Sequence, residues 1–309
     1  MTTKVSAPAK TQLGRTPSST IPVLTVILAI IMIWYAGAVH LNSDQIIDRY
    51  EKKGIDWSLV QLANDSWNMK RAVLPSPHQV LMELKATIID KNVTSKRSLI
   101  YHAGITLSST LVGFLLGASL GIGLAVGIVY VETLDKSLMP WIITSQTIPI
   151  LALAPMVIVV FGAMGISGLL PKALISMYLC FFPVAVGMVK GLRSPQPMLV
   201  DLLDTYSASK WQVFWRLRLP SAVPFLFASL KVAIALSLVG AIVAELPTGG
   251  QAGLGARLLS GSYYGQTNLI WASLIAAAVM SASLVSILGL IERKVCYRLA
   301  GGQEVSNEL

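Results

Sequence analysis

The sequence is poor in charged side chains: Asp, Glu, Lys and Arg make up 13% of its 309 residues, whereas 54% are apolar. The mean hydropathy is strongly positive. A composition with so little charge excludes an ordinary soluble domain and predicts an integral membrane protein.

Cysteine and histidine are also scarce. The two cysteines lie far apart, Cys180 inside an apolar segment and Cys296 beyond the last one. The three histidines, His40, His78 and His102, do not follow the spacing of metal ligands or of a catalytic cluster. The sequence therefore predicts no disulfide and no metal site, and a membrane enzyme is the weakest functional class.

Basic residues outnumber acidic residues by 24 to 15, which gives a formal net charge of +9. An excess of this size is compatible with nucleic-acid binding. Here, however, the basic residues flank apolar segments, as the topology signals of membrane proteins do. We therefore expect a lipid bilayer, and no nucleic acid, as a partner of the chain.

Six apolar segments are long enough to cross a bilayer core, which requires roughly 20 helical residues. They cover residues 21–39, 103–129, 138–161, 169–189, 224–244 and 269–291. The first has no A-x-A-like cleavage site close behind it and is interpreted as a retained helix. The sequence thus predicts an all-α integral membrane protein with six transmembrane helices. Both termini are expected in the cytoplasm, residues 1–20 as a disordered tail and residues 293–309 as a second tail.

The polar segment at residues 40–100 is expected on the periplasmic side. Ser76, followed by a proline and then by Gln79, has the pattern of a capped helix start. The apolar residues that follow are predicted to share one face of an amphipathic helix on the outer membrane surface: Val80, Leu81, Leu84 and Ile88. Residues 41–74 contain no recognisable site.

Residues 101–292 are predicted to form a transmembrane domain of five helices, and its glycines and prolines predict local geometry. Gly113, Gly117 and Gly121 recur at four-residue intervals, which allows a second helix to approach closely. Two prolines at positions 149 and 155 predict kinks in the helix expected at residues 138–161.

The loop at residues 191–222 separates the fourth and fifth apolar segments. A short helix is predicted after Pro197, and Ser209 with a glutamine three residues later predicts a capping box that starts a second short helix. Pro220 and Pro224 are expected to end this second helix. The basic excess of the loop predicts a cytoplasmic location.

The same loop carries a family resemblance. Permease subunits of binding-protein-dependent ABC importers have Glu-Ala-Ala, three residues, Gly, nine residues and Ile-x-Leu-Pro at this place. Residues 201–203, Ser207 and residues 217–220 fall at the same intervals. The chain resembles the subfamily that includes nitrate, taurine, sulfonate, bicarbonate and thiamine-precursor permeases, and residues 74–77 and 147–155 support the resemblance, as do residues 244 and 245.

The departures from the family pattern are that Asp201 replaces glutamate, that leucines replace both alanines, and that Ser207 replaces the glycine of the turn. Because serine can still cap a helix, we expect the loop geometry to survive with a slightly altered turn.

The resemblance implies a type-1 ABC importer permease fold in the bacterial inner membrane, with residues 191–222 as a coupling loop that docks on cytoplasmic ATPase subunits. The residues that it assigns to docking are Asp201, Leu202, Leu203, Tyr206, Ser207, Ser209, Trp211, Phe214, Leu217 and Pro220. Arg216 and Arg218 are expected to steer the encounter. The chain contains no G-x-x-x-x-G-K-[ST] motif, so ATP and Mg²⁺ are expected on the ATPase, and no cofactor is expected on this chain.

The resemblance also implies a periplasmic or lipid-anchored solute-binding protein and a second permease subunit, which is either another copy of this chain or a paralogue. The solute is expected to be a pyrimidine-like heterocycle or a small anion such as sulfonate or nitrate. Candidates for lining the pathway are Gln146, Glu245 and Thr248. For Glu245, which opens a glycine-rich loop, we favour a contact with solvent or a capping role over a contact with the solute.

An ion-coupled secondary transporter is the alternative function. Such a protein usually carries acidic residues inside its membrane segments or consists of repeated halves. The six apolar segments contain no Asp or Glu, and no convincing internal repeat is present, so the importer permease is favoured.

Overall fold

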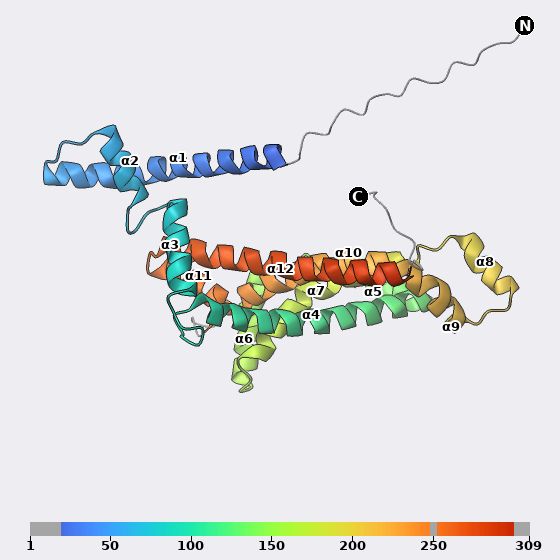
Figure 1. Cartoon of the computed structure of the whole chain (residues 1–309). Coiled ribbons are helices and arrows are strands. Elements are labelled where there is room, and N and C mark those ends of the chain that lie inside the picture. Colours follow the sequence, from blue (N-terminus) through green and yellow to red (C-terminus); the bar gives the residue numbers. More distant parts are fainter. Residues whose placement is uncertain (1–19, 248–251, 300–309) are drawn as a thin grey trace, which may run out of the picture. The chain divides into compact units, whose positions relative to one another are not determined.

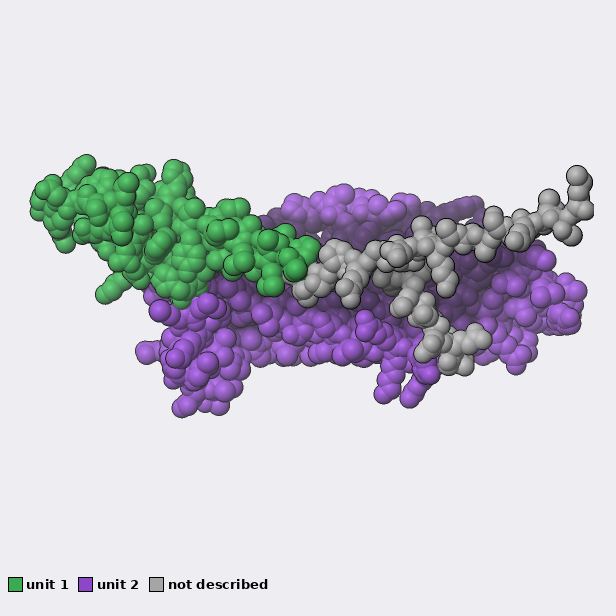
Figure 2. Space-filling view, turned by 45° about the horizontal axis from the view of Figure 1, so that its top comes forward, with its two compact units in different colours: residues 1–79 green, residues 80–309 purple. Residues whose placement is uncertain are grey.

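The computed structural model describes residues 20–247 and 252–299, and these residues form helices joined by turns (Figure 1). The chain divides into two compact units, unit 1 at residues 1–79 and unit 2 at residues 80–309 (Figure 2). The predicted tail at residues 1–20 lies, except for Thr20, outside the described residues. The helices are α1 (Thr20–Lys53), α2 (Leu59–Trp67), α3 (Pro77–Ile88), α4 (Leu99–Tyr130), α5 (Glu132–Ser145), α6 (Ile150–Ala163), α7 (Leu169–Leu192), α8 (Pro197–Thr205), α9 (Lys210–Val213), the π-helix η1 (Phe214–Arg218), α10 (Leu219–Glu245), α11 (Leu254–Tyr263) and α12 (Thr267–Leu299).

Five helical stretches are long and apolar enough to cross a membrane: α1, α4, α7, the continuous stretch from α9 to α10, and α12. The prediction of a single kinked helix over residues 138–161 is corrected, because α5 and α6 are separate helices at an angle of 97° to each other. Pro149 lies between them in an extended conformation. A proline disfavours the helical conformation of the preceding residue, so the chain breaks at this proline instead of bending.

The glycines predicted to allow close packing lie where α4 meets α7. A Cβ atom added to Gly113 would lie 2.3 Å from the Cβ of Ser176, and one added to Gly121 would lie 2.7 Å from the carbonyl oxygen of Phe181. These contacts confirm the predicted close approach. Because residue numbers rise together on both helices, α4 and α7 are parallel. The chain must therefore cross back between them, and α5 with α6 supplies this return as one broken span, which brings the total to six.

The helix α10 runs antiparallel to α7. Gly191 of α7 lies against Ala222 at the start of α10, whereas Gly240 near its end lies against Ser176. Unit 2 therefore has two ends. The ends of α4 and α7 and the start of α10 lie at one end with α8, and we call this the α8 end. The starts of α4 and α7 and the end of α10 lie with α11 at the other end, the α11 end.

Unit 1 is built on α1, which runs to Lys53 and not to the predicted end at residue 39. The later part of α1 packs against α2 through Ile46, Tyr50 and Leu62. Asn42, which is fully buried, donates to the carbonyl groups of Ser66 and Leu74 at 3.2 and 2.9 Å and accepts from backbone N–H groups of the same loop. The first part of the predicted polar segment therefore belongs to a small folded module.

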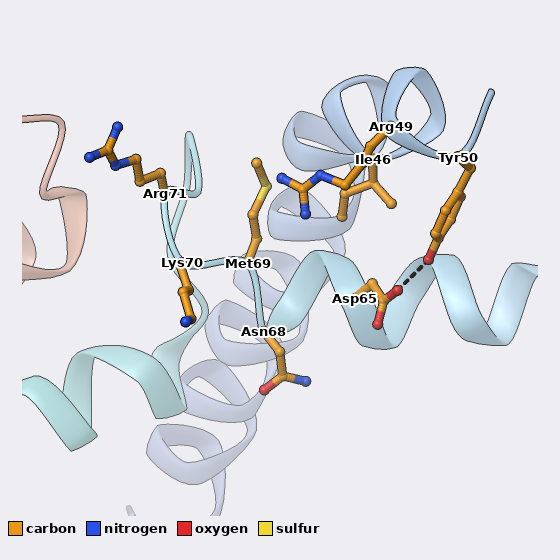
Figure 3. A pocket seen from close by; sticks show the side chains of 8 residues that line it. All are labelled: Ile46, Arg49, Tyr50, Asp65, Asn68, Met69, Lys70 and Arg71. Atoms are coloured by element: carbon orange, nitrogen blue, oxygen red, sulfur yellow. Dashed lines mark hydrogen bonds between the residues drawn. The ribbon is translucent and has the colours of Figure 1, made fainter. Parts of the chain in front are cut away.

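A hollow of about 490 Å³ opens on this module (Figure 3). Tyr50 of α1 donates a hydrogen bond to Asp65 of α2 beside it, and Arg49, Lys70 and Arg71 supply positive charge to its lining. None of the sequence-predicted site residues lies in this hollow.

The predicted helix after Ser76 is α3, but only half of its capping box forms. Gln79 accepts a hydrogen bond from the Ser76 N–H at 3.2 Å, whereas the Ser76 hydroxyl donates to the Trp67 carbonyl group at 2.9 Å. Within unit 2, Leu84 and Ile88 pack against the cluster around Leu99 and Leu254 at the α11 end. Leu81 does not share this face and is 64% exposed.

Candidate functional site: the loop from α8 to η1

The helix α8 begins and ends as the loop sequence predicts. Pro197 occupies its first turn, where the missing N–H costs nothing. At its end the Ser207 N–H donates to the Asp204 carbonyl group at 2.9 Å, and the Ala208 N–H donates to the Leu203 carbonyl group at 3.0 Å. These two bonds form a Schellman motif, which needs a residue with positive φ in the position of Ser207.

Ser207 has φ of 55° and is the only residue other than glycine with positive φ in the described part of the chain. The family's turn glycine is therefore replaced by a serine that keeps the glycine conformation. The capping bonds come from the backbone and not from the serine side chain, and the survival of the family's loop geometry stays a prediction.

The capping box predicted at Ser209 is confirmed. The Gln212 N–H donates to the Ser209 hydroxyl at 3.3 Å, and the Gln212 side chain accepts from the Ser209 N–H at 2.8 Å. This reciprocal pair starts α9 immediately after the turn that ends α8.

The prediction that Pro220 and Pro224 end the second helix is wrong. The helix continues from α9 through η1 into α10, and the apolar stretch Lys210–Glu245 counts 36 residues. In η1 the Leu219 N–H bonds to the Phe214 carbonyl group, five residues back. A π turn of this kind adjusts the backbone where the proline ring would crowd the preceding turn. The loop is therefore joined to α10 without an interruption.

The helices α8, α9 and η1 expose large apolar side chains among polar and charged ones, and we call their exposed surface the α8–η1 surface. Its most exposed apolar side chains are Met198 (79%), Tyr206 (77%), Trp211 (69%), Leu202 (51%) and Trp215 (50%). None of the residues of α8 is buried. Several large apolar side chains exposed on one short loop are typical of a contact with another molecule.

The ten predicted docking residues fall into two groups. The exposed group comprises Asp201, Leu202, Tyr206, Ser207, Ser209 and Trp211, and the half-buried group comprises Leu203, Phe214, Leu217 and Pro220. Phe214 packs against the core of unit 2 at the α8 end and contacts the Tyr130 ring edge-on at 6.0 Å. Trp215 was missed by the sequence analysis, although it follows Trp211 by one helical turn and contacts its ring at 5.4 Å.

The two arginines differ in their surroundings. Arg218 donates to the Leu192 carbonyl group at 3.2 Å and lies over the Tyr130 ring. It therefore holds the loop on the bundle, whereas Arg216 is exposed. A mainly apolar hollow of about 430 Å³ lies beside these residues and is lined by Val126, Gly127, Tyr130, Lys210, Trp211 and Phe214.

Glu245 lies at the opposite end of unit 2 and is fully buried. It accepts a hydrogen bond from the Gly255 N–H at 2.9 Å, and the Thr106 hydroxyl lies 2.9 Å from each of its carboxylate oxygens. Glu245 thus caps a backbone group, as the favoured alternative predicted. Two cationic or polar neighbours were missed by the sequence analysis: His102 accepts from the Gly253 N–H at 3.0 Å, and Lys172 donates to the Ala252 carbonyl group at 3.0 Å.

The other two pathway candidates are placed differently. Gln146 ends α5 at the break before α6, and its side-chain Nε2 is buried without a hydrogen-bond partner among the described residues. Thr248 lies outside the described residues.

The sequence matches the family described as "Binding-protein-dependent transport system inner membrane component" over residues 113–297, well over half of the chain. The chain belongs to this family. It is a multi-pass permease subunit of an ABC importer in the inner membrane, and the family implies partners that hydrolyse ATP and bind the solute.

Individual relatives agree with this assignment. The permease is 36% identical over 192 residues to the riboflavin transport system permease protein RibX of Chloroflexus aurantiacus, a match that covers 62% of this chain and 70% of the relative. It is 31% identical over 184 residues to the formylaminopyrimidine transport permease protein ThiX of Halalkalibacterium halodurans, covering 59% and 68%. It is 28% identical to the putative aliphatic sulfonates transport permease protein SsuC of Bacillus subtilis over 223 residues, covering 72% and 77%.

Proposed function

We propose that the α8–η1 surface is the docking site for a cytoplasmic ATPase subunit and that its movement drives the permease between inward- and outward-facing states. The supporting observation is the exposed apolar surface at the α8 end, which continues into the membrane helix α10 without a break. Tyr206 and Trp211 fill a groove on the ATPase, and Arg216 steers the encounter. With the α8 end on the cytoplasmic side, both ends of the chain lie in the cytoplasm.

The ATPase binds ATP and Mg²⁺, because the permease sequence lacks the phosphate-binding motif. A periplasmic or lipid-anchored binding protein delivers the solute at the α11 end. Two permease subunits, most simply two copies of this chain, enclose the pathway between them.

The solute class that we propose is a pyrimidine-like or related nitrogen heterocycle. Two of the relatives with the highest identity are named for riboflavin and for formylaminopyrimidine transport, at 36% and 31%, whereas the sulfonate and taurine permeases are 28% and 26% identical. Calorimetry on the cognate binding protein tests this class. Binding of a heterocycle supports it, and selective binding of taurine or an alkanesulfonate contradicts it.

Gln146 is proposed to contact the solute. Its amide is a buried donor without a partner at the break between α5 and α6, and a donor left in this state normally has a ligand, a water or a partner subunit nearby. We expect Gln146→Leu to raise the KM of uptake about tenfold through loss of one hydrogen bond. Thr144→Val on the same helix is the control, since Thr144 is exposed and bonds within its own helix.

Transport by the whole complex in proteoliposomes tests the function. Uptake is expected to require ATP on the ATPase side and the binding protein on the other side. Uptake by the permease alone, driven by a proton or sodium gradient, would identify a secondary transporter and contradict the proposal.

A further inference from the structure

We propose that Thr106 and Glu245 are positioning residues that fasten the start of α11 to α4 and α10, and that this joint stays closed throughout transport. The inference goes beyond the proposed docking of the ATPase and does not depend on the identity of the solute. It is carried by the hydrogen bonds, burial and close backbone contacts at the α11 end of unit 2.

The first observation concerns the start of α11. Gly253, Leu254 and Gly255 have free N–H groups that no residue of α11 can satisfy. Each finds a side chain of another helix: His102 accepts from Gly253 at 3.0 Å, Thr106 accepts from Leu254 at 2.9 Å, and Glu245 accepts from Gly255 at 2.9 Å. The N-cap residue Gly253 has no side chain, so α4 and α10 together supply the cap that a serine or aspartate usually provides.

The second observation is that Thr106 connects the two other helices as well. Its hydroxyl oxygen accepts from the Leu254 N–H and lies 2.9 Å from both carboxylate oxygens of Glu245. One threonine of α4 therefore contacts α10 and α11 at once. Both Thr106 and Glu245 are fully buried.

The third observation is that the two glycines at the start of α11 lie very close to α10. A Cβ atom on Gly253, which has φ of 124°, would lie 2.1 Å from the carboxyl carbon of Glu245. One on Gly255 would lie 2.2 Å from the Ile242 carbonyl oxygen. Only glycine permits this approach, so the Gly-Leu-Gly sequence at residues 253–255 is explained by the joint and not by flexibility.

These contacts favour a joint that stays closed. Opening it would break the hydrogen bonds of a buried carboxylate and of three backbone N–H groups, and breaking hydrogen bonds at a buried site is strongly unfavourable. We therefore expect α4, α10 and α11 to move as one body during transport.

A reversible cross-link tests whether the joint opens. Arg257 of α11 donates to the carbonyl group of Arg97, just before α4, at 3.2 Å. Cysteines introduced by Arg97→Cys and Arg257→Cys are joined with a bis-methanethiosulfonate reagent in the Cys296→Ser background, while the fully buried Cys180 is left in place. Uptake by the complete transporter is expected to persist after cross-linking. Loss of uptake that dithiothreitol restores would show that the joint opens, and would overturn the proposal.

Replacement of the threonine tests whether the joint positions α11. Thr106→Val keeps the shape of the side chain but removes the hydroxyl, and we expect uptake to fall at least about tenfold. Thr106→Ser keeps the hydroxyl and is expected to keep uptake. In Thr106→Val the cysteine introduced by Arg257→Cys is expected to react faster with a maleimide, while one introduced by Lys136→Cys, at an exposed position of α5 outside the α8–η1 surface, reacts unchanged. Wild-type uptake and wild-type labelling in Thr106→Val would contradict the proposal. If Thr106→Val does not assemble, the proposal is judged by the cross-link alone, because that experiment leaves Thr106 and Glu245 unchanged.

Discussion

Replacement of Ser207 tests the geometry of the docking loop most directly. Its φ of 55° lies in the left-handed region, which a residue with a Cβ atom adopts at a cost of about 1–2 kcal/mol. Ser207→Gly removes this strain without changing a contact of the side chain. Ser207→Val increases the strain, because a β-branched residue tolerates positive φ least.

The expected change in the stability of the turn in Ser207→Gly follows from two opposing free-energy contributions. Glycine gains about 1–2 kcal/mol from relief of strain and loses about 0.4–1 kcal/mol through the greater freedom of the unfolded loop. The net stabilisation of the turn is about 1 kcal/mol, which corresponds to about fivefold in its opening equilibrium. Ser207→Val is expected to shift the same equilibrium at least about as far in the opposite direction.

Hydrogen exchange measures this equilibrium, because the Ser207 and Ala208 N–H groups make the two bonds of the turn. We expect both amides to exchange about fivefold more slowly in Ser207→Gly and faster in Ser207→Val, with the permease in nanodiscs. Ser194→Gly, in the same loop but without positive φ, is the control and should not slow exchange. Equal exchange in the Gly and Val variants would refute the assignment of a strained Schellman turn.

Three further predictions concern other parts of unit 2. Tyr206→Glu places a charge on the exposed α8–η1 surface and is expected to abolish co-purification of the ATPase while membrane insertion is unchanged. Gly113→Leu forces a side chain into the space held by Ser176 and should destabilise the permease by about 3 kcal/mol or more in thermal unfolding. Lys231 forms an ion pair with Glu292, and a double-mutant cycle of Lys231→Met and Glu292→Gln should give a coupling of about 1–2 kcal/mol.

The chain offers a matched control for each of these variants. Tyr263→Glu places the same charge on an equally exposed tyrosine at the α11 end, and it should leave ATPase association intact. Gly123→Leu adds the same side chain to α4 where no atom lies within 4 Å, and its unfolding temperature should stay close to wild type. A cycle of Lys136→Met with Glu132→Gln, an exposed pair, should give the smaller coupling of a surface pair.

The sequence predicted best those features whose partners lie a few residues apart. The capping box of Ser209 and the turn at Ser207 depend on residues within one or two helical turns, so their spacing is visible in the chain. The glycine pattern of α4 predicted close packing, but not that α7 is the partner. Periodicity did not separate a kink from a break at Pro149, and it gave no sign of the π turn that carries the helix past Pro220.

The joint at Glu245 could not be predicted in the same way. Its partners come from Thr106, 139 residues earlier in the chain, and from Gly255 after the glycine-rich loop. A capping role for Glu245 was one of the open alternatives. Its partner Thr106, however, is one of several threonines and serines in an apolar helix, and the sequence does not distinguish it from the others. Only the parallel packing of α4 with α7, together with the antiparallel packing of α10 against α7, brings Thr106 and Glu245 together at the α11 end.

The arrangement of the two sites connects the two ends of unit 2 through one continuous helix. The 36 residues from α9 to the end of α10 form one helix of about 54 Å, because each helical residue adds about 1.5 Å. At the α8 end this helix carries Trp211 of the docking surface, and at the α11 end it carries Glu245 of the joint. In the proposed docking arrangement, a displacement imposed by the ATPase on α9 reaches α11 and, through Thr106, α4 along this one continuous helix. The break between α5 and α6, where the two helices meet at 97°, interrupts the helical backbone within the described part of unit 2. We thus expect motion in transport to be concentrated between that broken span and the body formed by α4, α10 and α11.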